Sequence, residues 1–296
     1  MNRSVALRAF AKINHGLKIL GKRPDGYHEL RTVYQTVHLH DRVEISLAPG
    51  SSTVEVECDD PLVPTGRENL VYRAAELWRG ARKYTGGIRI RLRKRIPAGS
   101  GLGGASADAA ATLVGLERLE GGQDLSFRAR LAARLGSDVP LFLWGGRTLG
   151  VGRGEEVYPM LELPRRYCLI VFPGFSVSTP AAYREASLRL TRTHKERNTN
   201  SFGAWPHFSL EEWGPAENDF EPVVFARWPE LADLKASLIR AGAEAASLTG
   251  SGSAVYAIFD SARKLKSALR FVPRKWRVFR TRTVSRAEYR RLQFIG

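Results

Sequence analysis

The alternation of apolar and polar positions predicts strands early in the chain, followed by a mixture of helices and strands. Ile88–Leu92 (IRIRL) alternates strictly, as a half-buried strand does. Leu70–Arg82 instead spaces its apolar residues as a helix does. By the same reasoning, other alternating or apolar segments predict strands at Val5–Ala11, Val43–Leu47, Val54–Glu57, Leu169–Phe172, Ala254–Phe259 and Trp276–Thr283.

Helices are predicted between and after these strands. One begins in a glycine-rich turn after residue 96 and extends to about Leu119, and a second covers Ser126–Leu135. Ser126 is the predicted N-cap of the second helix, and Gly136 follows its last residue. Three more helices are predicted at Phe220–Arg227, Leu231–Ala241 and Arg263–Phe271.

This mixture of helices and strands is typical of an α+β protein, here in two lobes. Residues 145–166 are rich in glycine, proline and charge, so we place the transition between domains there. The predicted domains are residues 1–158 and 159–296. Residues 190–215 are polar and irregular and predict an excursion without regular structure.

Composition excludes a wholly disordered, collagenous or coiled-coil chain. The chain has 296 residues, of which 43% are hydrophobic and 26% charged, which is ordinary for a globular protein. Two cysteines are too few for a disulfide framework and fit a reducing compartment. Charged residues interrupt the apolar N-terminal stretch, and no apolar run approaches the roughly 20 residues of a membrane span. We therefore expect a cytoplasmic protein without a membrane partner.

The positive charge is concentrated near the C-terminus. Of the net charge of +16, residues 261–296 carry +11, from 12 basic residues and one acidic residue. Such a segment can bind nucleic acid or a membrane surface. Apolar residues interleave with these charges, however, so the pattern favours the solvated face of a final helix and strand.

The most informative segment is the run PAGSGLGGASAD at residues 97–108, which follows a predicted strand and opens a predicted helix. Its four glycines allow positive φ angles and a close approach to a ligand. The free N–H groups of the helix start would then form a phosphate cradle, and Ser106 adds a hydroxyl for a phosphate or a magnesium ion. A tight turn without a ligand is the alternative interpretation.

Two well-known phosphate-binding motifs do not account for this segment. A Walker A loop requires Lys-Ser or Lys-Thr after the last glycine, where Ala105-Ser106 stands. The bare GxGxxG template fits, but the acidic residue that a dinucleotide site needs about 20 positions later is not cleanly present. Glu117 and Glu120 lie inside the predicted helix.

Three ordered motifs together resemble the GHMP kinases, a family named after galactokinase, homoserine kinase, mevalonate kinase and phosphomevalonate kinase. The glycine-rich segment resembles the family's phosphate loop. Ala11–Asn14 (AKIN) precedes it, and Leu248–Ala254 (LTGSGSA) forms a second glycine-rich loop before a strand. Lys18–Arg31 (KILGKRPDGYHELR) narrows the resemblance to members that phosphorylate a cytidine-diphosphate-linked sugar alcohol of the non-mevalonate isoprenoid pathway.

The resemblance implies a fold, an activity and partners. The N-terminal lobe is expected to resemble ribosomal protein S5, the C-terminal lobe to resemble a ferredoxin-like sandwich, and ATP and substrate to meet between them. The implied cofactors are ATP and Mg²⁺, and the implied partner is a small molecule, with no specific nucleic acid. A monomer or weak homodimer is expected. The alternatives are a homoserine- or mevalonate-type kinase and a basic RNA-binding protein with an S5-like fold.

The resemblance also implies roles for single residues. Asp138 would accept the proton of the substrate hydroxyl, and Lys12 would face Asp138 and the reacting oxygens. Tyr27 and Tyr183 would stack on the two faces of the cytosine, and His28 would hydrogen-bond its edge.

Further residues are implied only as contacts. No residue is implied as a metal ligand, since Mg²⁺ is inferred from the chemistry of phosphoryl transfer alone. The substrate would also touch Asn14, Thr179, Gly250, Ser251 and Gly252. ATP would touch Pro97, Gly99, Ser100, Gly101, Leu102, Gly103, Gly104, Ala105 and Ser106, with Asn69 and Lys94 near the adenine.

Overall fold

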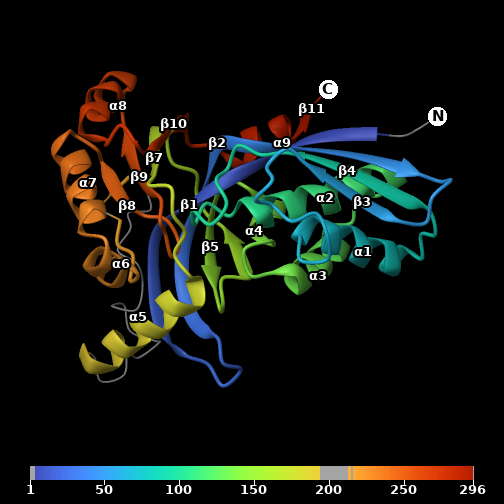
Figure 1. Cartoon of the computed structure of the whole chain (residues 1–296), viewed down its shortest axis with the longest axis horizontal. Helices are drawn as coiled ribbons and strands as arrows, with labels where there is room; N and C mark the ends of the chain where they lie inside the picture. Colours follow the sequence, from blue (N-terminus) through green and yellow to red (C-terminus); the bar gives the residue numbers. More distant parts are fainter. Residues whose placement is uncertain (1–3, 194–212, 215, 296) are drawn as a thin grey trace.

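The protein consists of two mostly antiparallel β-sheets, each covered by helices (Figure 1). The computed structural model describes residues 4–193, 213–214 and 216–295. The α+β two-lobe prediction is confirmed. None of the described helices is long and apolar enough to cross a membrane.

The first sheet is built on a long β-hairpin, β1 (Ser4–Lys22) and β2 (His28–Ala48), which crosses most of the molecule (Figure 1). One half of β2 pairs with β4 (Gly87–Arg93), and β3 (Val54–Cys58) lies parallel to β4. The alternation predicted for β4 is confirmed, since its isoleucines and leucine are buried and its arginines exposed. The remaining strands are β5 (Arg147–Val151), β6 (Glu156–Pro159) and β11 (Phe294–Ile295).

Helices that pack against one another and against this sheet enclose the first core. Trp78 from α1 and Leu113 from α2 are buried among the isoleucines of β2 and β4. The helices are α1 (Leu70–Arg82), α2 (Gly104–Glu120), α3 (Leu125–Leu135) and α4 (Leu141–Trp144).

The second sheet has the order β10-β7-β9-β8 and is antiparallel throughout. Its strands are β7 (Tyr167–Phe172), β8 (Ala245–Leu248), β9 (Val255–Phe259) and β10 (Arg277–Arg282). The helices of this part are α5 (Thr179–Thr193), α6 (Glu221–Arg227), α7 (Pro229–Arg240), α8 (Ala262–Ala268) and the 3₁₀ turn η2 (Leu269–Phe271). The last helix, α9 (Arg286–Gln293), returns to the first sheet, where Tyr289 packs against Phe10 of β1.

The hairpin joins the two sheets into one structure. Alternate residues of β7 enter different cores: Leu169 packs toward the helices, and Ile170 packs toward Ile13 and Val37 of the hairpin. Because both faces of β7 are covered, its sequence is a continuous apolar run rather than an alternating one. The boundary at 158/159 stays a prediction.

The structure corrects one predicted helix cap and adds detail to two other predictions. The N-cap of α3 is Asp124, not Ser126, because the Asp124 carboxylate accepts the Phe127 N–H at 2.9 Å. Residues 145–166, predicted as a domain transition, contain the hairpin β5–β6. The predicted excursion at 190–215 begins as the end of α5, and most of its remainder lies outside the described residues.

Candidate active site

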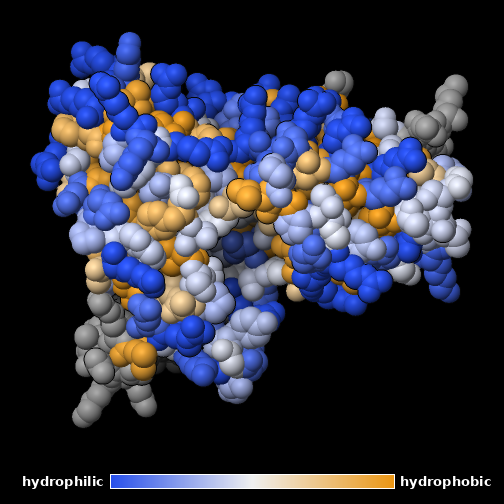
Figure 2. Space-filling view, in the orientation of Figure 1, coloured by the Kyte–Doolittle hydropathy of each residue, from blue (hydrophilic) through white to orange (hydrophobic). Residues whose placement is uncertain are grey.

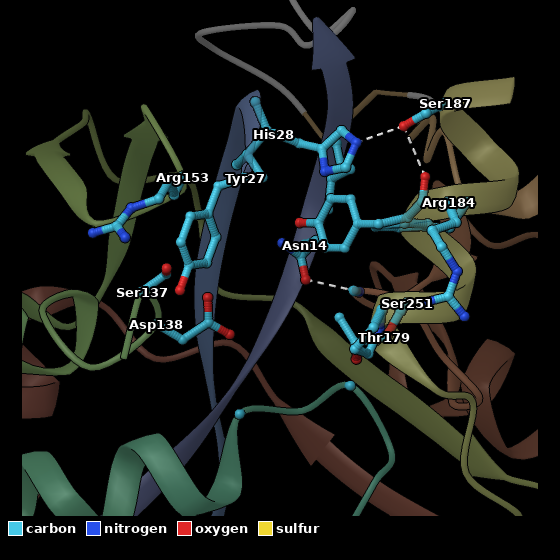
Figure 3. Close-up of a pocket in the computed structure, with 18 of the residues that line it drawn as sticks. Asn14, Tyr27, His28, Ser137, Asp138, Arg153, Thr179, Arg184, Ser187 and Ser251 are labelled. Atoms are coloured by element: carbon cyan, nitrogen blue, oxygen red, sulfur yellow. Dashed lines mark hydrogen bonds between the residues drawn. The ribbon is translucent and has the colours of Figure 1, made fainter. Parts of the chain in front are cut away.

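A cavity of about 1000 Å³ lies where the hairpin, the phosphate loop, the second glycine-rich loop and α5 meet. The molecular surface is visibly hollowed between the arm that ends in the hairpin and the helices α1–α3 (Figure 2). Side chains from both sides of the cavity face one another in Figure 3. Residues far apart in the sequence therefore share one pocket.

One end of the cavity holds a lysine and an aspartate. Lys12 Nζ lies 3.5 Å from Asp138 Oδ2 and donates to Asn14 Oδ1 at 2.6 Å. Tyr34 donates from its hydroxyl to Asp138 Oδ1 at 3.0 Å. Asp138 follows α3 and the turn at Gly136, and the strand pairing places Tyr34 opposite Asn14. We call these four residues the reacting end.

The electrostatics of the reacting end follow from burial. Burial lowers the pKa of Lys12, and the nearby Asp138 charge opposes this by favouring the ammonium form. Burial, assisted by Asp138, raises the pKa of the Tyr34 hydroxyl well above its ordinary value. Tyr34 is therefore a protonated donor toward Asp138 at neutral pH. Asp138 keeps 33% of its side chain exposed and faces the cavity.

The phosphate loop passes directly beside the reacting end. Gly101 and Gly103 have φ angles of +80° and +75°, which favour glycine. A Cβ on Gly101 would lie 2.1 Å from the carbonyl oxygen of Thr249, so only glycine fits there. Gly103 is the N-cap residue of α2, whose first N–H groups have no partner within the helix. The loop thus presents a helix start to the cavity, as an anion site requires.

The second glycine-rich loop is tied to the same residues. The amide of Gly250 donates to Asn14 Oδ1 at 2.8 Å, and the hydroxyls of Ser251 and Thr179 lie 2.8 Å apart. Asn14 also donates to Thr32 Oγ1 at 2.8 Å. The Asn14 amide oxygen thus accepts from both Lys12 and Gly250, and it holds Lys12 and the second loop in fixed positions.

The opposite end of the cavity is aromatic. The rings of His28 and Tyr183 stack at 4.8 Å with an interplanar angle of 15°. His28 Nε2 lies 2.5 Å from Ser187 Oγ, and the Ser187 hydroxyl donates to the Tyr183 carbonyl at 2.8 Å (Figure 3). Burial, with a smaller effect of Lys22, lowers the pKa of His28, so its ring is neutral at pH 7. We call Tyr27, His28, Tyr183 and Ser187 the aromatic end.

Tyr27 lies across the cavity from His28 (Figure 3). Its side chain is 55% exposed, and the Arg153 guanidinium lies 4.7 Å from its ring centroid. Lys22 and Arg184 also line the cavity. The aromatic end is therefore surrounded by cations.

Most, but not all, of the predicted site residues line this cavity. Those that do are Lys12, Asn14, Tyr27, His28, Gly101, Gly103, Ser106, Asp138, Thr179, Tyr183, Gly250 and Ser251. Those that do not are Asn69, Lys94, Pro97, Gly99, Ser100, Leu102, Gly104, Ala105 and Gly252. The catalytic and binding roles of both sets stay predictions.

The two residues predicted near adenine have partners within the protein. Asn69 caps α1 by accepting the Val71 N–H at 2.8 Å. Lys94 Nζ lies 2.5 Å from carboxylate oxygens of both Asp41 and Asp108, in a buried triad beneath the phosphate loop. These contacts do not require ATP.

Sequence analysis missed several residues of the cavity. Tyr34, Arg153, Arg184 and Ser187 all line it, and none belongs to a recognised motif. Tyr34 pairs with Asn14 across the hairpin. Its place in the site could therefore be predicted only if the pairing register of the two strands were already known. Among the described residues, no cluster of three or more histidine, cysteine or acidic side chains could hold a metal ion.

Family comparisons match both halves of the chain. Residues 69–146 match the GHMP kinases N terminal domain, and residues 203–278 match the GHMP kinases C terminal domain. The 4-diphosphocytidyl-2-C-methyl-D-erythritol kinase of Solibacter usitatus is 44% identical, over 98% of this chain and 92% of its own length. That of Pelotomaculum thermopropionicum is 41% identical, over 92% of this chain and 96% of its own length.

Solved structures agree with these matches. A crystal structure of 4-(cytidine 5'-diphospho)-2C-methyl-D-erythritol kinase superposes with a TM-score of 0.72 at 33% identity, covering 94% of this chain and 98% of that one. A mevalonate kinase from L. major has a TM-score of 0.70 at 15% identity, covering 95% and 96%. The second match supports the fold alone.

Proposed function

Because the chain belongs to the GHMP kinase family, we propose that it transfers the γ-phosphoryl group of ATP to the 2-hydroxyl of 4-diphosphocytidyl-2-C-methyl-D-erythritol. The relatives that match nearly its whole length carry the name of that kinase. The observation that carries the proposal is the single cavity with Lys12 and Asp138 at one end and an aromatic, cation-lined end opposite. Those two ends suit a reacting alcohol and a cytidine diphosphate, respectively.

Asp138 takes the substrate proton late in the reaction. An alcohol has a pKa of about 15.7, as water does, and an aspartate about 3.9. Complete deprotonation before attack would cost roughly 16 kcal/mol. A loose transition state avoids this cost, because the hydroxyl attacks while still protonated and becomes acidic only as the new P–O bond forms. Asp138 orients the hydroxyl first and accepts its proton afterwards.

Lys12 and Tyr34 support that step in different ways. The Lys12 ammonium stabilises the negative charge that develops on the transferring oxygens. Its contacts with Asn14 and Asp138 fix it in position before substrate binds. Tyr34 donates to Asp138 Oδ1, which leaves Oδ2 for the substrate hydroxyl. Tyr34 is therefore a positioning residue.

The phosphates of ATP would bind at the start of α2. The N–H groups after Gly103 supply donors, and Ser106 places a hydroxyl in the cavity. Mg²⁺ usually keeps several waters and binds substrate phosphates with only one or two protein ligands. Ser106 fits such a partial shell, and the ion would neutralise charge on the phosphates.

His28 supplies a basis for recognising cytosine. The Ser187 hydroxyl has one proton, and with that proton donated to the Tyr183 carbonyl, the contact with His28 takes the proton on His28 Nε2. In the neutral ring, Nδ1 is then a hydrogen-bond acceptor. The 4-amino group of cytosine is a donor, whereas the corresponding oxygen of uracil is an acceptor. A ring held in this tautomer favours the cytidine compound.

The remaining features of the aromatic end suit a nucleoside diphosphate. Tyr27 and the stacked pair of His28 and Tyr183 offer aromatic surfaces on opposite sides of the cavity (Figure 3). Stacking on one aromatic ring contributes about 1–3 kcal/mol per base in nucleic-acid binders. Arg153 and Arg184 offer guanidinium groups for the diphosphate. The planar fork of N–H donors in each guanidinium can bind two phosphate oxygens at once.

The proposal is tested with the purified protein, ATP, magnesium and a panel of alcohols. The panel contains the cytidine compound, its uridine analogue, homoserine and mevalonate. We expect ADP and a 2-phosphate from the cytidine compound, with the uridine analogue much poorer. Faster turnover of homoserine or mevalonate would overturn the substrate while leaving the family intact.

The other interpretations have less support. Homoserine and mevalonate kinases share the fold but are below 20% identical to this chain. All the relatives reported above are kinases, so none of them favours an RNA-binding protein. A monomeric or weakly dimeric state and a cytoplasmic location belong to the same proposal and follow from the kind of enzyme.

A further inference from the structure

A second concave surface lies on the second sheet, away from the cavity. It is an open groove of about 990 Å³ lined by β10, by the β2 residues His38–His40, by Lys94 and Arg95, and by α8. None of its lining residues lines the cavity described above. β10 is the edge strand of its sheet, so one side of the groove is an open strand edge.

The charge of this groove is strongly positive and only partly compensated. Lys94 is neutralised by Asp41, and Arg282 forms an ion pair with Glu288 at 2.7 Å. No carboxylate occurs among the groove's lining residues within the part of the chain that the structure describes. The uncompensated cations have exposed side chains and form no ion pair with a carboxylate of the described residues: Arg95, Lys266, Arg277 and Arg280.

Aromatic and apolar side chains lie between these cations. Tyr167 is 42% exposed and lines the groove beside β10. Phe279 lies under the Arg277 guanidinium, at 5.3 Å from its ring centroid. Tyr167 is therefore the accessible ring, while Phe279 is half-buried and holds Arg277 above it. A cationic groove with an accessible aromatic ring is an arrangement that binds single-stranded nucleic acid, because phosphates pair with the cations and a base stacks on the ring.

We propose that this groove, which we call the β10 groove, binds single-stranded RNA without sequence preference. Three of its four uncompensated cations are arginines, whose planar guanidinium groups match phosphate better than an ammonium does. A lipid surface is a poorer fit, because a flat headgroup layer would meet the rim rather than the concave floor. An acidic peptide would satisfy the cations but would leave the aromatic rings without a stacking partner. The β10 groove also accounts for part of the basic C-terminal segment.

The first test measures binding of fluorescently labelled oligouridylate by anisotropy, between about 50 and 200 mM salt. The variant carries Arg95→Gln, Arg277→Gln and Arg280→Gln together. Each lost phosphate contact reduces the salt slope by about 0.7, so we expect a reduction of about 2 and at least tenfold weaker binding. Kinase activity and thermal unfolding should match those of the unaltered chain, which shows that the fold is retained.

A matched control separates the groove from the overall charge. Arg73→Gln, Arg130→Gln and Arg134→Gln remove three exposed arginines from α1 and α3, in the other sheet's helical layer. We expect oligouridylate binding close to that of the unaltered chain. Equal losses in the two triple variants would assign binding to net charge and overturn the proposal. So would absence of oligouridylate binding at the lowest salt.

Two further arms test the kind of partner. Tyr167→Ser should weaken oligouridylate binding severalfold, because it removes a stacking surface and leaves the charge unchanged. Duplex RNA, whose bases are unavailable for stacking, should bind less tightly than oligouridylate. Duplex binding as tight as oligouridylate binding would overturn the single-strand assignment. Preferential binding to vesicles of anionic phospholipid, lost in the groove variant, would identify a membrane instead.

Discussion

The two ends of the active-site cavity are built in opposite ways. At the reacting end, Lys12 and Asn14 are 3% and 1% exposed and are joined by hydrogen bonds to each other and to the second glycine-rich loop. At the aromatic end, Tyr27 is 55% exposed and has a guanidinium as its ring partner. The first end is fixed by the protein before any ligand binds. At the second end the exposed Tyr27 side chain can adjust to a ligand, whereas His28 and Tyr183 are already stacked on each other.

This difference separates two kinds of function. Catalysis requires groups held in position before the transition state, because reorganisation during the reaction would raise the barrier. Recognition of a base tolerates adjustment, since stacking accepts a range of positions. We therefore expect changes at the reacting end to lower kcat, and changes at the aromatic end to raise KM or alter substrate preference. Four substitutions test this division.

The largest effect is expected for Asp138→Asn. The amide keeps the size of the side chain but cannot accept the substrate proton. Loss of a general base typically costs about 10²–10⁴ in rate, so we expect a fall of that order in kcat with little change in KM. Asp124→Asn is the control, because asparagine also caps a helix and Asp124 lies at the start of α3. Turnover near that of the unaltered chain would remove Asp138 from the mechanism.

The second-largest effect is expected for Gly101→Ala, which changes the contact between the two glycine-rich loops. In Gly101→Ala the new Cβ would meet the Thr249 carbonyl oxygen at 2.1 Å, so the loops must separate. Overpacking of this kind costs about 1–3 kcal/mol, and we expect ATP affinity measured by calorimetry to fall by about thirtyfold.

Gly174→Ala is the control for backbone strain. Gly174 has a φ of +95°, and nothing lies within 4 Å of the position of its Cβ. It therefore carries the conformational cost of alanine without the clash. Equal ATP affinity in the two variants would show that the contact between the loops does not shape the phosphate site.

The reacting end was more predictable from sequence than the aromatic end, and the reason is local. Residues 97–108 form their turn and helix start from neighbouring residues, so the motif can be read directly. Asp138 and Lys12 each belong to a recognisable segment. Ser187 acts through contacts with His28, 159 positions away, which no short motif encodes.

The fold shows the same limit. The segments Val5–Ala11 and Val43–Leu47 were predicted as short strands, yet they are the outer parts of the long strands β1 and β2. The middle of the hairpin, around Ile13 and Val37, packs against the second sheet, so its sequence does not alternate cleanly there. A polar residue such as Asn14 looks like a strand breaker there, although loop contacts bury and satisfy it. Alternation reveals a strand only where one face meets water.

Tyr34→Phe tests whether the fixed geometry at Asp138 matters. The substitution removes the hydrogen bond at 3.0 Å and leaves the ring in place. A hydrogen bond to a charged group contributes about 1.5–3 kcal/mol. Because Asp138 is partly exposed, we expect the lower figure and about a tenfold fall in kcat.

The same substitution should leave KM for the alcohol unchanged, because Tyr34 acts on Asp138 rather than on the substrate. Tyr158→Phe is the control, because the Tyr158 side chain is exposed and does not line the cavity. A rise in KM alone would show that Tyr34 is merely part of the cavity wall.

The smallest effect is expected for Ser187→Ala, which releases His28 Nε2 and lets both ring tautomers form. A neutral hydrogen bond contributes about 1 kcal/mol, so the preference for the cytidine over the uridine compound should fall about fivefold. Both compounds should still be phosphorylated, because the reacting end is intact. Ser126→Ala on α3 is the control and should keep the preference of the unaltered chain.

The pH dependence of this preference gives the same test without a substitution. Protonation of His28 turns Nδ1 from an acceptor into a donor, which removes the basis for choosing cytosine. Burial lowers the pKa of His28, so the neutral ring persists as the pH falls through 6.5, the ordinary histidine value. The ratio of kcat/KM for the two compounds should therefore stay constant from pH 8 to about 6.5 and decline only below that range. A ratio that stays constant at a pH where the NMR signals of the His28 ring show protonation would assign base recognition to groups other than this ring.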